Sequence, residues 1–251
     1  MVGGLLLLGG LLGAALPAGA GPTCRGVALT DPHAPMTGTA GNGVLLGTSA
    51  GETINGLGGV DLICGGGSDD DLYGGGGNDT FVGGDGADRL YGKGGCDHLK
   101  GGIGNDLLFP GASGAACAGS LERQGGRDRV VISAVGKNDV FGGPGKDTLD
   151  FRQSPVGMLV DLDAGSPTCD FIDVLTTSSV IYDVEVVFGS QFSDLLHGSD
   201  GNDDLRGFGG DDYLFGGDGD DRLIGGDGTD EVDGFNGSDY CEGEIPDLCN
   251  D

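Results

Sequence analysis

Basic residues are scarce in this sequence. Its 251 residues include 12 Lys plus Arg against 40 Asp plus Glu, which gives a formal net charge of −28 at pH 7. A chain this negative repels the phosphate backbone of nucleic acids and the surface of anionic membranes. The scarcity therefore argues against both partners and favours a cation.

Glutamate is scarce as well. Of the 40 acids only six are Glu, so 34 are Asp. An acidic surface that served solubility alone would use both residues. The short Asp carboxylate stays close to the backbone in turns and suits an oxygen-ligand cation site. The bias towards Asp thus indicates cation binding.

The common catalytic motifs are missing. There is no HExxH helix, no GxSxG elbow and no Walker loop. Neighbouring aspartates such as Asp211 and Asp212 resemble a glycosidase pair, but such pairs recur along the chain, which suits ligation better than a single catalytic site. We therefore predict no catalytic residues and no enzyme activity.

A segment long enough to cross a membrane is missing too. The apolar stretch near the start, Leu5 to Leu16, is broken by glycines and is shorter than the roughly 20 residues of a span. It ends near Ala18-Gly19-Ala20, a small-x-small cleavage pattern. We predict a signal peptide over residues 1–20, a mature chain from Gly21 and secretion to the extracellular space.

No CxxC pair occurs, which argues against zinc. In an exported chain seven cysteines predict disulfides. We expect Cys24 to pair with Cys64 and Cys241 with Cys249, because bridges there would cap the ends of the repeat arrays described next. Cys96 with Cys117 is a third candidate pair, and Cys169 is then left over.

Glycine is abundant, at 58 residues, and it recurs with a nine-residue period. The period runs from Gly38 to Gly101 in a first array, 38–109, and from Gly189 to Gly243 in a second, 189–243. In nearly every unit the sixth residue is an acid and the eighth is apolar, as Asp88 and Leu90 are in the unit that starts at Gly83. Disordered acidic chains have no reason for such spacing.

Each unit predicts a tight turn followed by a short strand. The first six residues form the turn, whose glycines supply positive φ, and the last three form the strand, whose middle residue faces the core. One apolar residue per unit builds a core only if the units stack. Two units, 18 residues, then make one coil, and units n and n+2 share an edge, which brings their aspartates together.

The pattern GGxGxDxUx resembles the repeats-in-toxin, or hemolysin-type, calcium-binding repeat. Units Gly83 to Tyr91, Gly101 to Phe109 and Gly216 to Ile224 match it in full. The resemblance implies an all-β, right-handed parallel β-roll in which Ca²⁺ is held between stacked turns by carbonyl oxygens and sixth-position aspartates. Pairing unit n with n+2 predicts about eight Ca²⁺ ions. The expected ligands are Asp61, Asp70, Asp79, Asp88, Asp97, Asp106, Asp147, Asp194, Asp203, Asp212, Asp221, Asp230 and Asp239.

Residues 110–188 lose the nine-residue phase. One good unit remains, Gly142 to Asp150, and alternating apolar residues at Val156 to Leu162 and at Val184 to Phe188 predict strands. We expect wider coils joining the two arrays, with a separate globular domain as the alternative, and a loop over 111–129. Residues 21–37 would then be an N-terminal cap and 244–251 a C-terminal cap tail.

The favoured function is a secreted calcium-binding structural or adhesive module. Two alternatives remain open: a calcium-dependent extracellular hydrolase whose site lies in 110–188, and a module that binds cell-wall or other glycans. Aromatic residues such as Tyr73, Tyr91 and Phe215 could serve the glycan module or pack stacked rungs. The sequence names no partner beyond calcium ions.

Overall fold

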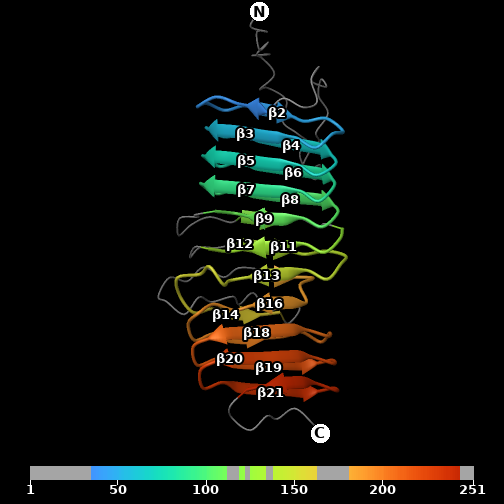
Figure 1. The fold of residues 1–251 in the computed structure, drawn as a ribbon, viewed down its shortest axis with the longest axis vertical. Helices are drawn as coiled ribbons and strands as arrows, with labels where there is room; N and C mark the ends of the chain where they lie inside the picture. Colours follow the sequence, from blue (N-terminus) through green and yellow to red (C-terminus); the bar gives the residue numbers. More distant parts are fainter. Residues whose placement is uncertain (1–34, 112–118, 122–124, 134–137, 163–180, 244–251) are drawn as a thin grey trace, which may run out of the picture.

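The computed structural model describes residues 35–111, 119–121, 125–133, 138–162 and 181–243. The predicted signal peptide and the C-terminal tail lie outside these ranges. Within them the chain forms strands and turns and no helix, and the strands stack into a single column (Figure 1). No helix in this described part has the length and apolar character needed to span a membrane.

The strands form three parallel sheets. The largest contains, in spatial order, β1 (Met36–Thr37), β3 (Thr53–Gly58), β5 (Asp71–Gly76), β7 (Arg89–Gly94), β9 (Leu107–Phe109), β11 (Arg129–Val131), β13 (Thr148–Asp150), β16 (Val186–Phe188), β18 (Asp204–Gly209), β20 (Arg222–Asp227) and β22 (Tyr240–Glu242). The second contains β2 (Val44–Leu46), β4 (Leu62–Gly67), β6 (Thr80–Asp85), β8 (His98–Ile103), β10 (Gly119–Leu121), β12 (Asn138–Phe141) and β15 (Ile181–Tyr182). The third contains β14 (Leu159–Asp161), β17 (Leu195–His197), β19 (Tyr213–Asp218) and β21 (Glu231–Asn236).

The register of the arrays follows the repeat. Leu72 pairs with Leu90 and Leu205 with Leu223, so each strand lies beside the strand two units later in the sequence. Every pairing between these strands is parallel. The predicted all-β parallel roll with 18 residues per coil is therefore confirmed.

The eighth residue of each unit forms the core. From Ile54 to Leu108 in the first array and from Leu196 to Val232 in the second, these side chains are at most 2% exposed. They belong to one continuous apolar cluster that also includes residues of the middle stretch, such as Leu149. Burying each contributes about 1.5–3 kcal/mol, and stacking makes this burial possible.

The strands are longer than the sequence predicted. β6 (Thr80–Asp85) runs from the last three residues of one unit through the first three of the next, including Gly83 and Gly84. The predicted six-residue turn is wrong in this respect, because the glycine backbone goes on pairing with the next coil, as Gly84 does with Gly102. Only the middle of each unit, as at Gly86, is left to form the bend.

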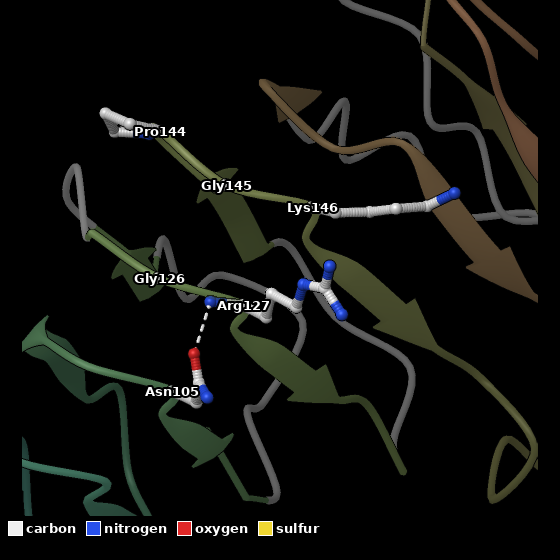
Figure 2. Close-up of a pocket in the computed structure, with 6 residues that line it drawn as sticks. All are labelled: Asn105, Gly126, Arg127, Pro144, Gly145 and Lys146. Carbon is white, nitrogen blue, oxygen red and sulfur yellow. Dashed lines mark hydrogen bonds between the residues drawn. The ribbon is translucent and has the colours of Figure 1, made fainter.

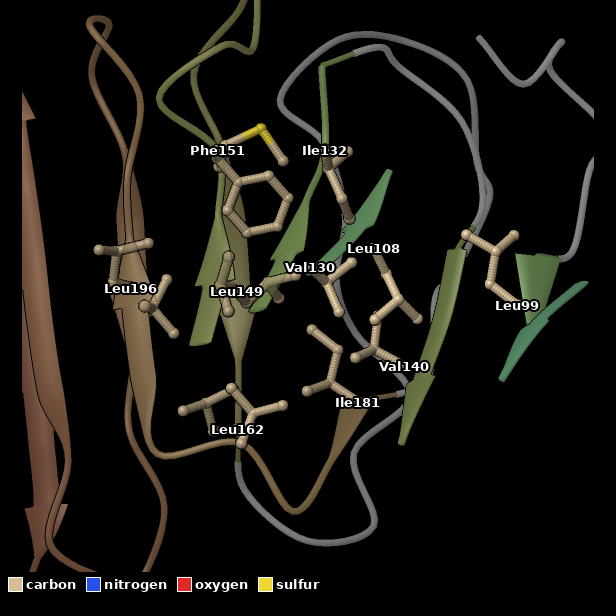
Figure 3. Packing of buried hydrophobic residues seen from close by; sticks show 14 of the residues in the cluster. Leu99, Leu108, Val130, Ile132, Val140, Leu149, Phe151, Leu162, Ile181 and Leu196 are labelled. Atoms are coloured by element: carbon tan, nitrogen blue, oxygen red, sulfur yellow. The ribbon is translucent and has the colours of Figure 1, made fainter. Parts of the chain in front are cut away.

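The largest sheet continues through the middle stretch. Leu108 pairs with Val130, Val130 with Leu149, and Leu149 with Val187, so the steps along the chain differ from 18 while the stacking is kept. Figure 3 shows Val130, Val140, Leu149 and Ile181 packed around this part of the core. Extra residues are therefore accommodated between strands and do not interrupt the sheet.

One local prediction for this stretch is wrong and one is confirmed. Strand β10 lies inside the predicted loop 111–129. The strands predicted from the alternating residues at 156–162 and 184–188 are present as β14 and β16. In β16 the fully buried core residue is Val187, which lies between Val186 and Phe188 of that alternation. Without the nine-residue phase, the local pattern does not define which residue of a strand faces the core.

Candidate metal centre

The sixth-position aspartates point into the coil. They lie two residues before the core residue, and the alternation of an extended chain turns both side chains to the same side. Asp61, Asp79, Asp88, Asp212 and Asp230 are at most 3% exposed. The repeat thus buries a carboxyl group at the end of most half-coils, next to the apolar core.

Stacked aspartates are joined by one recurring hydrogen bond. The backbone N–H of Asp70 donates to Oδ1 of Asp88 at 2.9 Å, and the N–H of Asp88 donates to Oδ1 of Asp106 at 2.9 Å. All eight predicted pairs make this contact. They are Asp61/Asp79, Asp70/Asp88, Asp79/Asp97, Asp88/Asp106, Asp194/Asp212, Asp203/Asp221, Asp212/Asp230 and Asp221/Asp239.

The second carboxylate oxygen of most of these aspartates is buried and has no hydrogen-bond partner. A buried, unsatisfied polar atom costs about 1–3 kcal/mol, and more when it is charged. Such an oxygen calls for a proton or a cation. The atoms concerned are Oδ2 of Asp61, Asp70, Asp79, Asp88, Asp97, Asp106, Asp128, Asp147, Asp212, Asp221 and Asp230, and Oδ1 of Asp203.

A backbone carbonyl of a neighbouring coil lies close to several of these oxygens. A Cβ added to Gly56 would lie 2.5 Å from Asp61 Oδ2 and 2.6 Å from the carbonyl oxygen of Gly74. Glycine at the first position therefore leaves room for a carboxylate oxygen and a carbonyl oxygen from the next coil to converge. Hard oxygen ligands of these two kinds are those that Ca²⁺ prefers.

Burial raises the pKa of several of these carboxyl groups. Desolvation raises the pKa of Asp70, Asp106 and Asp212 to about 7, against the lowering effect of a backbone hydrogen bond. Neighbouring carboxylates in the stack raise these pKa values further. The charged form is thus disfavoured unless positive charge enters the stack.

Asp128 belongs to the same stack but was missed in the sequence. It is 3% exposed, its Oδ1 accepts the N–H of Asp106 at 2.8 Å, and its own N–H donates to Asp147 Oδ1 at 2.8 Å. The available signal was the Asp-x-apolar spacing of Asp128 and Val130. Asp128 and Val130 do not fall on the nine-residue glycine period of either array, so the search for repeat units did not find them.

Two predicted ligands differ from the rest. Asp194 is buried, but its oxygens accept hydrogen bonds from the Ser190 N–H, the Ser190 hydroxyl and the Met158 N–H. Asp239, at the end of the second array, is only half-buried and accepts the Asp221 N–H. Neither appears among the buried partnerless oxygens.

No group of three or more His, Cys, Asp or Glu side chains suited to a metal occurs in the described ranges. Acidic side chains here meet in pairs, so a bound cation would need carbonyl oxygens as well. His197 is half-exposed and lies 3.7 Å from Asp161, away from the stacked aspartates.

An open groove lies at the turn edge of the middle stretch (Figure 2). It is lined by Asn105, Gly126, Arg127, Pro144, Gly145 and Lys146. The N–H of Arg127 donates to Asn105 Oδ1 at 2.9 Å, while the Arg127 and Lys146 side chains are exposed. This groove is a consequence of the turn stacking and holds none of the buried carboxylates.

Comparison with protein families agrees with this geometry. Four copies of the RTX calcium-binding nonapeptide repeat match, over residues 46–81, 82–113, 188–223 and 215–245, which together cover half of the chain. No curated protein matches significantly. The chain therefore belongs to the family of RTX calcium-binding nonapeptide repeat proteins.

Proposed function

We propose that this chain is a secreted protein that folds into its β-roll on binding several Ca²⁺ ions and acts as an extracellular structural or adhesive module. One observation carries the calcium part of the proposal. Buried carboxylate oxygens without partners are stacked in register along the coil edges. Calcium would neutralise the stacked carboxylates and supply the missing partner of each oxygen.

The ligands would come from neighbouring coils. Six of the eight predicted pairs consist of two aspartates that both keep a partnerless buried oxygen, and Asp106/Asp128 and Asp128/Asp147 add two more. The proposed number thus stays at about eight. The eight pairs are Asp61/Asp79, Asp70/Asp88, Asp79/Asp97, Asp88/Asp106, Asp106/Asp128, Asp128/Asp147, Asp203/Asp221 and Asp212/Asp230.

Calcium suits these ligands better than magnesium does. Carboxylate and carbonyl oxygens fit the six to eight ligands of Ca²⁺, whose coordination is flexible. Magnesium demands tight octahedral geometry and keeps its waters, which a buried coil edge cannot hold. Zinc prefers nitrogen and sulfur ligands.

Calcium binding and folding should be one event. Without the ion each close pair of carboxylates costs on the order of 1–4 kcal/mol, and one core residue per unit does not offset this together with the ordering of glycine turns. Extracellular calcium modules bind at roughly 10⁻⁴–10⁻³ M. This range suits a chain that folds after export.

The test is a calcium titration of the mature chain followed by circular dichroism and sedimentation velocity. We expect a largely disordered, expanded chain in excess chelator and a steep transition to a compact strand-rich form with calcium. Magnesium at the same concentrations is the control and should give little change. A strand-rich signal in chelator that calcium does not alter would contradict the proposal.

Secretion is tested by the location and N-terminus of the protein. We expect it in the culture medium, beginning near Gly21. A retained Met1, or protein found only in the cytosol, would rule secretion out. The adhesive role is tested by calcium-dependent binding of the folded protein to cell walls, and a hydrolase panel with calcium addresses catalysis.

The aromatic residues give little support to a glycan-binding function. The Tyr73 and Tyr91 rings stack at 4.7 Å with 4° between their planes, and Tyr91 stacks on Phe109 at 4.7 Å. A ring that uses its faces for its neighbours in the ladder does not offer them to a sugar. These three rings therefore pack the rungs of the roll.

A further inference from the structure

The backbone of the second residue takes one of two conformations, depending on the unit. In later units of the arrays it has a positive φ, even where it is not glycine, as at Leu57 (φ 77°) and Phe208 (φ 79°). In the first two units of each array it is a hydroxyl residue, and none of these residues has a positive φ. These four residues are Thr39, Thr48, Ser190 and Ser199.

The hydroxyl residue at this position donates to the acid of its own unit. The Ser190 N–H donates to Asp194 Oδ2 at 2.6 Å, and the Ser190 hydroxyl donates to Asp194 Oδ1 at 2.9 Å. The Met158 N–H, from the preceding coil, also donates to Asp194 Oδ1, at 2.6 Å. Asp194 is fully buried, yet both its oxygens have protein donors.

The same arrangement recurs in the other units. The Thr48 N–H donates to Glu52 Oε2 at 3.1 Å, and the Thr48 hydroxyl donates to Glu52 Oε1. The Ser199 N–H and hydroxyl both donate to Asp203 Oδ2, at 2.7 and 3.0 Å, and leave Oδ1 without a partner. The unit at Thr39 has no acid at its sixth position.

The two conformations present opposite groups to the coil interior. Where the second residue has a positive φ, the carbonyl of the first glycine faces the coil before it, as the Gly207 carbonyl oxygen does at 2.8 Å from the Cβ position of Gly189. In the Ser199 unit the Gly198 carbonyl oxygen lies 3.1 Å from His197 Nδ1 instead. A turn with an inward carbonyl offers a cation a ligand, whereas a turn with an inward N–H satisfies the carboxylate itself.

We propose that the first acid-bearing unit of each array is independent of calcium: Thr48 and Ser190 take the place of the ion at Glu52 and Asp194, and this unit is the template on which the later, calcium-dependent coils assemble. The inference rests on the proposed calcium function and adds where the ions are not bound. A template at the start of an array lowers the cost of the first ordered coil, which is the hardest step in a stacked repeat. Met158 fixes the second template to the coil before it.

The experiment uses the mature chain and the variant Ser190→Gly. In excess chelator we expect wild-type amides of residues 189–199 to exchange more slowly than those of residues 65–106, by tenfold or more. Ser190→Gly should lose that protection. With calcium it should recover it and bind one more ion than wild type, as counted by native mass spectrometry.

The matched control is Ser238→Gly, an exposed serine whose hydroxyl touches no acid in the described structure. It should change neither the ion count nor the protection of residues 189–199. Equal exchange of residues 189–199 and 65–106 in wild-type chain with chelator would overturn the inference, and so would an unchanged ion count in folded Ser190→Gly. A wild-type chain that binds no calcium would instead refute the proposed function.

Discussion

The backbone N–H of Asp106 donates to Oδ1 of Asp128 at 2.8 Å, although 22 residues separate them. In the arrays the same bond joins residues 18 apart, as between Asp70 and Asp88. The stacking of carboxylates therefore continues from the first array into the middle stretch. Asp128 and Asp147 extend the proposed calcium sites beyond the two arrays.

Replacing Asp128 by Ala should weaken calcium-dependent folding as much as replacing Asp88 does. Each change removes a proposed ligand from two stacked pairs and deletes an acceptor for a backbone N–H, which is worth about 1.5–3 kcal/mol when the acceptor is charged. The measurement is the calcium midpoint of the circular dichroism transition, which should rise for both variants. Asp200→Ala, at an exposed aspartate, is the control. A midpoint for Asp128→Ala equal to that of Asp200→Ala would contradict the assignment.

Replacing Gly56 by Ala should disrupt the first array. The new Cβ would lie 2.5 Å from Asp61 Oδ2 and 2.6 Å from the Gly74 carbonyl oxygen, both of them proposed ligand atoms. We expect a loss of more than about 2 kcal/mol of stability in calcium, in the range of overpacking in cores. Gly76→Ala is the matched control, because nothing lies within 4 Å of its Cβ position. Urea unfolding in calcium measures both, and equal midpoints would refute the crowding argument.

Acid should favour the calcium-free fold. Burial raises the pKa of Asp70 and Asp212 to about 7 and that of Asp88 and Asp221 to about 6, against about 3.9 in an unfolded chain. The folded state binds more protons between these values, so this stability is fully present below about pH 4 and is lost as pH rises towards 7. In chelator we expect more strand signal at pH 4.5 than at pH 7.5.

The same pKa values predict competition between protons and calcium. Below about pH 6 protons occupy the carboxylates, so the calcium midpoint should rise as the pH falls from 7.5 to 5. Isothermal titration at several pH values measures this, together with the protons released on binding. A midpoint that does not depend on pH would show that the buried carboxylates are already ionised without calcium.

The predicted disulfides Cys24–Cys64, Cys96–Cys117 and Cys241–Cys249 each have one member outside the described residues, so the pairings stay predictions. Bridges at the array ends would limit fraying of coils that lack a neighbour and contribute roughly 2–4 kcal/mol. Peptide mapping without reduction should recover the Cys24–Cys64 and Cys241–Cys249 peptides as linked pairs. Alkylation of Cys24 or Cys241 as a free thiol would refute this assignment.

The sequence by itself determined the parallel roll, its core and the stacking of its aspartates. Each unit such as Gly83 to Tyr91 contains its own turn and its own core residue, and it contacts mainly the units two positions away. A nine-residue repeat therefore predicts both the local fold and the register of the strands. Asp70 could be placed beside Asp88 from their separation of 18 residues alone.

Only the tertiary structure decided which residues stack and which enter the core where the nine-residue period is lost. Asp128 joins the stack, and Val187 enters the core, because insertions of unequal length set the register there. The same holds for Asp194, whose donor Met158 lies 36 residues earlier. An aspartate whose carboxylate accepts a hydrogen bond from a distant N–H cannot be told in the sequence from an aspartate whose carboxylate needs a cation. Only the folded backbone brings a donor to the first and a carbonyl oxygen to the second.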